Sequence, residues 1–313
     1  MNKITIVGAG RVGESTAQFI AAQDMCREIA LLDINQGAAE GAALDIQEVA
    51  PLFKYDTRLH GGSNGSLMAG SELVIITAGL PRKPGMTRDD LLAPNINIID
   101  GILDDVMKYA PDCLLLFVTN PVDVVTYYAW KKTGWARNRI FGQAGVLDSS
   151  RMASFIAMET GYSTIDINTM VLGGHGDTMV PMHRYTTIAG IPISNFLGRD
   201  KLDDIVERTR HGGAEILALR QNSSAYDAPA ASVAEMVDAI VHNRKRILPT
   251  VSILEGEYGR EDIAIGVPAV LGNNGMEEII LLDMNDEETT MFHNSATIIE
   301  QHIHLLKNIK NLT

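Results

Sequence analysis

The chain has 313 residues, of which 46% are hydrophobic and 21% charged, an ordinary composition for a globular protein that can bury a sizeable core. Its formal net charge of −13 argues against nucleic acid as a partner, because phosphate binding needs a basic face. Two cysteines, Cys26 and Cys113, are too few for a disulfide framework. No apolar run approaches the ~18 residues that span a bilayer. The first residues enter a strand with no targeting segment, so we expect a cytoplasmic protein with no membrane partner.

The first half of the chain alternates short apolar runs with longer amphipathic ones. Strands are predicted at 3–8, 28–33, 72–78 and 113–120, and helices at 12–23, 39–50 and 98–110. Continuous apolar strands that alternate with helices are typical of a parallel sheet covered on both faces. We therefore expect a doubly wound α/β domain over residues 1–145.

The second half changes character. Long helices are predicted at 201–220, 230–246 and 286–309, and strands there are joined by short turns such as "EYGRED" and "GNNG", which indicate hairpins. This pattern predicts an α+β domain with antiparallel strands over residues 146–313. No linker separates the halves, so we expect them to pack tightly together.

A glycine-rich turn follows the first predicted strand. "VGAGRVG" contains Gly8, Gly10 and Gly13 in a GxGxxG pattern that opens the first helix, and Asp33 ends the next strand. These are the parts of a Rossmann dinucleotide fold, in which glycines let the pyrophosphate approach the helix N-terminus. Asp33 would accept hydrogen bonds from the adenosine ribose and repel a 2′-phosphate, which favours NAD over NADP. The alternative is that Asp33 is a helix cap or turn residue.

A histidine among glycines is the leading candidate for chemistry. "GGHGDT" places His175 just after a predicted strand, and the flanking glycines leave its ring little local packing. A lone histidine is more often structural, but hydride transfer to or from an alcohol needs a general base near neutral pH. "GVLDSSR" supplies Asp148 and Arg151, which share one helix face. Asp148 could orient His175 and Arg151 could bind a carboxylate, or the two could form an ordinary intrahelical ion pair.

Two arginines lie on a glycine- and proline-rich segment after the strand at 72–78. "AGLPRKPGMTR" carries Arg82 and Arg88. They could be incidental charges on a solvated loop, or they could bind a ligand with two negative charges. Asn120 ends the strand at 113–120, where its amide could reach substrate or nicotinamide, because ligands of open α/β sheets bind beyond the carboxyl ends of the strands.

Five motifs together carry a family resemblance. "VGAGRVG", "AGLPRKPGMTRDDLL", "VTNPVD", "GVLDSSR" and "GGHGDTMVP" follow one another in this order. The chain resembles the lactate/malate dehydrogenase family, in particular its malate branch with a lactate-dehydrogenase-like chain, from the first strand to the last helix. The resemblance implies reversible NAD-dependent oxidation of (S)-malate to oxaloacetate, a step of the tricarboxylic acid cycle, by hydride transfer with a His/Asp proton relay.

The resemblance also implies roles for individual residues. His175 would accept and donate the proton, Asp148 would be its partner carboxylate, and Arg151 would bind the carboxylate beside the reacting carbon. Arg88 would polarise the keto oxygen when its loop closes, and Arg82 would set the substrate class. Asn120 would contact substrate and cofactor. The other implied cofactor contacts are Gly8, Ala9, Gly10, Arg11, Val12, Gly13, Asp33, Asn95, Val118 and Thr119.

Several alternatives stay open at this stage. A lactate or other 2-hydroxy-acid dehydrogenase is the first, although Arg82 argues against it because lactate enzymes of the family usually carry glutamine there. An NAD-binding sensor without catalysis is the second, although His175, Asp148 and the arginines are all present. His183 is a weaker candidate for the proton donor because its segment, "MVPMHRYT", has no paired acid upstream. No residues have metal-ligand spacing. The family forms oligomers, with a tetramer favoured over a dimer. The apolar side of residues 39–53 could face a second subunit or its own sheet.

Overall fold

Six parallel strands form the first half of the main sheet. The computed structural model describes residues 1–80 and 89–310. The strands lie in the order β3-β2-β1-β4-β5-β6, with every pair parallel. Their bounds are β1 Lys3–Val7, β2 Glu28–Leu32, β3 Arg58–Gly62, β4 Leu73–Ile76, β5 Leu114–Phe117 and β6 Ile140–Gln143. This order is that of a dinucleotide-binding Rossmann sheet, so the predicted fold class is confirmed.

Both faces of this sheet are buried, which explains its continuous apolar strands. On β4, Leu73 and Ile75 belong to one apolar cluster and Val74 and Ile76 to the other, all with no exposed area. Helices α1 (Arg11–Ala22) and α2 (Gln36–Phe53) contribute to the first cluster, and α3 (Asp89–Tyr109) and α4 (Val122–Thr133) to the second. Alternate side chains of one strand thus enter different cores.

The same sheet continues into the second half of the chain. Strand β12 (Arg246–Glu255) pairs antiparallel with β6, where Thr250 lies opposite Gln143, and then with β13 (Glu261–Gly272). Strands β8 (Val171–Gly173) and β9 (Met179–Pro181) follow, and β14 (Gly275–Ile279) pairs with β13. A small separate sheet holds β7 (Ile167–Asn168), β10 (Thr187–Ile188) and β11 (Ile191–Pro192). The two predicted hairpins join β12 to β13 and β13 to β14, and this shared sheet holds the halves together.

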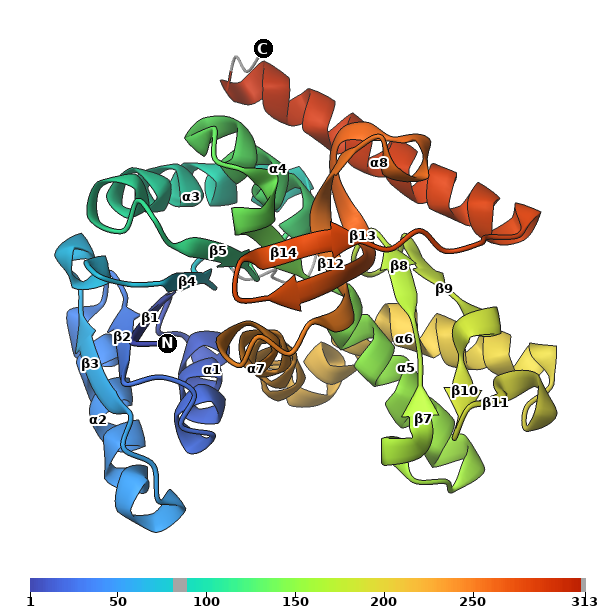
Figure 1. Cartoon of the computed structure of the whole chain (residues 1–313), viewed down its shortest axis with the longest axis horizontal. Helices are drawn as coiled ribbons and strands as arrows, with labels where there is room; N and C mark the ends of the chain where they lie inside the picture. The colour runs from blue at the N-terminus through green and yellow to red at the C-terminus, as the bar shows by residue number, and fades with distance from the viewer. Residues whose placement is uncertain (81–88, 311–313) are drawn as a thin grey trace.

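The α-helices of the second half, as far as residue 310, are α5 (Gly145–Thr160), α6 (Arg199–Arg220), α7 (Asp227–Val241) and α8 (Asp286–Lys310). Helix α7 packs beside α1, and the long C-terminal helix α8 lies across α4 and the β12–β13 region (Figure 1). A third apolar cluster, which includes Met152, Ile156 and Ile205, lies between α5 and α6. In the described ranges, no helix is both long enough and apolar enough to cross a membrane.

The largest differences from the predicted helix ends lie at the end of α7 and at the start of α3. Helix α7 ends at Val241 rather than at 246, because Asn243 and Lys245 have φ of 50° and 54° and β12 begins at Arg246. Helix α3 begins at Asp89 rather than at 98, so Pro94 lies inside it. Proline usually interrupts a helix, which is why the pattern predicted a later start.

Candidate active site

The glycine-rich turn joins β1 to α1 at the carboxyl edge of the sheet. A Cβ on Gly13 would lie 1.8 Å from the Gly8 carbonyl oxygen, and one on Gly8 would lie 2.6 Å from the Ala78 nitrogen. By contrast, a Cβ on Gly10 would meet no atom within 4 Å. Gly10 is also the N-cap of α1, and no side chain in the described part of the chain caps that end. Two glycines therefore allow close backbone packing, and the third leaves the positive helix end open to a phosphate.

Asp33 lies against this turn. Its Oδ2 accepts a hydrogen bond from the Ala9 backbone at 2.8 Å, and its Oδ1 accepts one from the Asn35 backbone at 2.9 Å. The N-cap of α2 is Asn35, whose side chain accepts from the Ala38 backbone. Asp33 is therefore not the helix cap, and its carboxylate lies beside the open end of α1. Each oxygen keeps a lone pair that a ribose hydroxyl can use.

The ends of β4 and β5 are linked by buried polar side chains. Asn95 of α3, only 1% exposed, accepts from the Leu80 backbone at 2.7 Å and donates to the Asn120 carbonyl at 2.8 Å. Thr119 donates to the Ala78 carbonyl at 2.7 Å. Asn95 thus uses its side-chain amide to hold the segment that carries Val118, Thr119 and Asn120, while Asn120 itself is exposed at the sheet edge.

His175, Asp148 and Arg151 come together from a loop and helix α5. The Nδ1 atom of His175 lies 2.9 Å from Oδ2 of Asp148, and Nη1 of Arg151 donates to Oδ1 of the same carboxylate at 3.4 Å. Asp148 is 1% exposed. An ionised carboxylate only accepts hydrogen bonds, so in this contact Nδ1 of His175 is the donor, and Nε2 is the ring nitrogen that can accept a proton. The helical ion pair and the orientation of His175, which the sequence presented as alternatives, coexist on one carboxylate.

Arg151 is a largely buried cation with spare hydrogen-bonding capacity. Its side chain is 12% exposed and lies against Gly212 of α6, where a Cβ would approach its Cδ to 3.3 Å. Burial lowers the pKa of the guanidinium, and the charge of Asp148 opposes that change. Its Nε is buried without a hydrogen-bond partner among the described residues. A desolvated guanidinium of this kind binds a carboxylate strongly, because the anion replaces lost hydration.

Two predicted residues are not placed. Arg82 and Arg88 lie outside the residues that the structure describes.

The competing histidine, His183, lies in the 3₁₀-helix His183–Tyr185. Burial and then the charge of Arg199 lower the pKa of His183, which makes it a poor proton acceptor. Residues 1–80 and 89–310 contain no cluster of three or more potential metal ligands.

Sequence reasoning missed the residues that hold the His175 loop. Asp123, at the start of α4, accepts from the His175 backbone nitrogen at 3.4 Å, and Ser295 of α8 accepts from the Gly174 nitrogen at 2.8 Å. Asp123 belongs to the quoted motif "VTNPVD", which was a usable signal. Ser295 lies more than a hundred residues further along the chain and carries no local signal.

The fold and this site define an oxidoreductase of the dinucleotide-binding class. Residues 2–142 match the family model described as lactate/malate dehydrogenase, NAD binding domain, and residues 145–310 match the lactate/malate dehydrogenase, alpha/beta C-terminal domain. The chain belongs to the lactate/malate dehydrogenase family.

Similar proteins and similar solved structures match this chain over almost its full length. The chain is 64% identical over 307 residues to a malate dehydrogenase of Thioalkalivibrio sulfidiphilus, covering 98% of this chain and 100% of that protein. The structure of malate dehydrogenase from Salinibacter ruber is similar with a TM-score of 0.94 and 41% identity, covering 99% of each chain. A Cryptosporidium parvum lactate dehydrogenase, complexed with lactic acid and nicotinamide adenine dinucleotide, is similar with a TM-score of 0.95 and 33% identity over 98% of each chain.

Proposed function

We propose that the chain is an NAD-dependent malate dehydrogenase that interconverts (S)-malate and oxaloacetate. The observation that carries the proposal is the 2.9 Å contact between His175 and the buried carboxylate of Asp148, whose other oxygen contacts Arg151. In this proposal His175 and Asp148 serve as the proton relay, and Arg151 beside them binds the substrate carboxylate. The relative from Thioalkalivibrio sulfidiphilus, which carries the name malate dehydrogenase, supports the choice of substrate.

The cofactor end fits NAD. The open N-terminus of α1 at Gly10 suits the pyrophosphate, and the carboxylate of Asp33 suits ribose hydroxyls while repelling a 2′-phosphate. The other proposed cofactor contacts lie at the same edge of the sheet: Gly8–Gly13, Asn95 and Val118–Asn120. A cofactor bound there would supply the hydride chemistry, with its oxidised form as acceptor for the hydride from C2 of malate and its reduced form as donor to oxaloacetate.

The chain's own residues bind substrate and move the proton. Arg151 holds the carboxylate next to C2. In malate oxidation, Nε2 of His175 accepts the hydroxyl proton while Asp148 stabilises the resulting imidazolium. In the reverse direction, His175 returns that proton to the alkoxide oxygen.

Arg82 and Arg88 complete the proposal on the basis of the family resemblance. Oxaloacetate has two carboxylates, and Arg82 would bind the one that Arg151 does not, while Arg88 would polarise the carbonyl. A pyruvate methyl opposite Arg82 would leave a charge unpaired, at a cost of a few kcal/mol. Because about 1.4 kcal/mol is tenfold in rate, a large preference for oxaloacetate follows.

Substrate preference tests this proposal. NADH oxidation, followed by absorbance with oxaloacetate and pyruvate in parallel, should show a strong preference for oxaloacetate. Arg82→Gln should lower the ratio of the two kcat/KM values by roughly tenfold or more. Arg58→Gln, on the exposed edge of β3, is the control and should leave the ratio unchanged. An unchanged ratio in Arg82→Gln would remove Arg82 from the specificity role, and wild-type preference for pyruvate would favour a lactate dehydrogenase instead.

The proposal extends to the organisation of the molecule. We place the boundary between the cofactor and substrate domains at residue 145, where β6 leads into α5. We also propose a cytoplasmic homo-oligomer, with a tetramer favoured over a dimer. Its support is the outer side of α2, where Leu44, Leu52 and Phe53 are 61%, 78% and 63% exposed. Exposed apolar side chains gathered on one helix mark an interaction surface.

A further inference from the structure

The loop that carries His175 has little conformational preference of its own. Glycines occupy positions 173, 174 and 176, and Gly173 and Gly176 have φ of 79° and 83°, in the left-handed region. Glycine loses the most conformational freedom when it is fixed, so such a loop adopts one shape only if outside contacts impose it. The position of the His175 ring therefore depends on what holds the loop.

Among the described residues, three helices contribute side-chain contacts that hold it, in addition to the backbone pairing of β8 with β9 at its base. The ring meets Asp148 of α5 at 2.9 Å, the His175 backbone nitrogen donates to Asp123 of α4 at 3.4 Å, and the Gly174 nitrogen donates to the Ser295 hydroxyl of α8 at 2.8 Å. The bond to Ser295 is the shorter of the two backbone contacts. It is also wholly buried, since Ser295 has no exposed area.

Ser295 fits the loop closely. A Cβ on Gly173 would lie 2.9 Å from the Ser295 oxygen, and a Cβ on Gly174 would lie 3.2 Å from Cδ1 of Ile299, one turn further along α8. The loop thus rests directly on this face of α8, and the hydroxyl accepts a hydrogen bond from its backbone.

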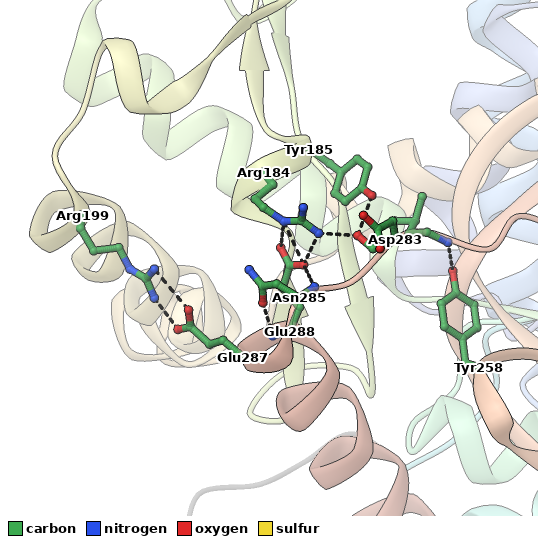
Figure 2. Close-up of polar contacts among 9 residues, drawn as sticks. Arg184, Tyr185, Arg199, Tyr258, Asp283, Asn285, Glu287 and Glu288 are labelled. Atoms are coloured by element: carbon green, nitrogen blue, oxygen red, sulfur yellow. Dashed lines mark hydrogen bonds and ion pairs between the residues drawn. The ribbon is translucent and has the colours of Figure 1, made fainter.

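Helix α8 is itself held firmly at both ends. At its start, Asn285 and Glu288 exchange hydrogen bonds as a capping box, and Arg184 donates to Glu288 (Figure 2). Near its end, Lys307 and Lys310 pair with Asp262 and Asp100 of the neighbouring elements. A hydroxyl on such a helix is a rigid reference point for the loop.

We propose that Ser295 is a positioning residue for the reaction, because its hydroxyl anchors Gly174 and so sets the distance and angle at which His175 meets the substrate. The inference rests on the proposed dehydrogenase function. Ser295 has no exposed area, so we assign it a role through the backbone next to His175 rather than through contact with a ligand. General acid–base catalysis is sensitive to small displacements, so loss of this anchor lowers the rate of proton transfer more than it weakens binding.

The test compares Ser295→Ala with Ser252→Ala. Ser252 of β12 is also fully buried, and its hydroxyl donates to the Thr250 carbonyl of its own strand. Ser252→Ala therefore removes the same hydroxyl group at a position that does not contact the His175 loop. With oxaloacetate and NADH, Ser295→Ala should lose on the order of tenfold in kcat, while its affinity for NADH is unchanged. The isotope effect on kcat with NADH deuterated at the transferred position should rise, because the chemical step becomes more rate-limiting. Ser252→Ala should change neither.

Ser295→Cys keeps the shape of the side chain with a weaker acceptor, and its kcat should fall between those of wild type and Ser295→Ala. A merely structural role would lower the active fraction of enzyme and leave the isotope effect where it is. Two results would overturn the inference, provided that wild type turns over oxaloacetate. One is that Ser295→Ala and Ser252→Ala have the same kinetics, and the other is that Ser295→Ala loses kcat with an unchanged isotope effect. Failure of wild type to turn over oxaloacetate would instead contradict the proposed function, and this inference with it.

Discussion

Asp148 serves two partners at once, and its charge is the property that both need. One oxygen accepts from His175 and the other from Arg151, in a setting that is almost fully buried. A neutral amide of the same shape would keep the packing but could present its NH₂ group to Nδ1 of His175. That contact would favour the tautomer with a proton on Nε2, which cannot accept a proton from malate.

We therefore expect Asp148→Asn to lower kcat by about 10²- to 10⁴-fold, with NADH affinity retained. Steady-state kinetics and an NADH titration measure the two quantities. The chain contains a matched control: Asp238 of α7 lies 2.9 Å from Nδ1 of His242 and also pairs with Arg244, but on the surface. Asp238→Asn should leave kcat unchanged. Similar losses in both variants would mean that the effect is not specific to the site.

At the scale of residues, the sequence predicted the chemically reactive side chains better than the side chains that hold them in position. The His175, Asp148 and Arg151 set was predicted because each residue type has a reactive role and a motif around it. Asp123 and Ser295 were not, because their function is to bind backbone nitrogen atoms. Such contacts depend on tertiary approach, which for Ser295 joins residues 121 positions apart.

At the scale of elements, the start of α8 carries a buried polar cluster outside the site. Glu288 is buried and accepts from Arg184 and from the Asn285 backbone (Figure 2). Burial alone would raise the pKa of Glu288, but the hydrogen bonds from Arg184 and Asn285 outweigh it, so the pKa is lowered. A carboxyl group with a lowered pKa in the folded state stabilises the fold above its unfolded pKa, and this contribution is lost as pH falls through the folded value.

Glu288→Gln should consequently lower Tm at neutral pH, by an amount that reflects about 1 kcal/mol, because the amide can still cap the helix but lacks the charge that Arg184 and the helix N-terminus favour. The difference from wild type should shrink as pH falls below the ordinary glutamate range of about 4.3. Melting curves at several pH values measure it. The control is Glu287→Gln, whose partner Arg199 and own side chain are both more than half exposed, and a smaller change is expected there. A constant difference across pH would contradict the assignment.

The alternation of apolar strands and amphipathic helices was enough to predict the parallel sheet. Helix ends were less predictable, since α7 ends where two non-glycine residues adopt positive φ, a choice set by the entry into β12. The shared sheet, in which β12 pairs with β6, could not be foreseen because nothing local joins Thr250 to Gln143.

At the scale of the whole molecule, α2 is apolar on two sides. Its inner side carries the buried residues Ala39, Ala43 and Ile46, whereas Leu52 and Phe53 of the same helix are largely exposed. The sequence left two alternatives for this helix, packing on its own sheet and contact with a second subunit. The two alternatives concern different side chains of the helix.

If the outer side forms a subunit contact, Leu52→Glu should shift the solution mass toward smaller species, because it buries a charge at each symmetric contact. Light scattering measures the mass. Ile191→Glu, at a similarly apolar exposed position on β11, serves as the control and should leave the mass unchanged. A monomer mass for the wild-type protein would exclude the oligomer altogether.

The most direct test of the account concerns His175, on which the fold, the anchors and the proposed chemistry converge. The measurement is NADH binding and turnover of oxaloacetate by His175→Asn beside wild type. We predict that NADH affinity is retained while kcat falls by about 10²- to 10⁴-fold, because the cofactor contacts remain and the proton relay is lost. Turnover near the wild-type rate would contradict the account, since another group would then have to move the proton.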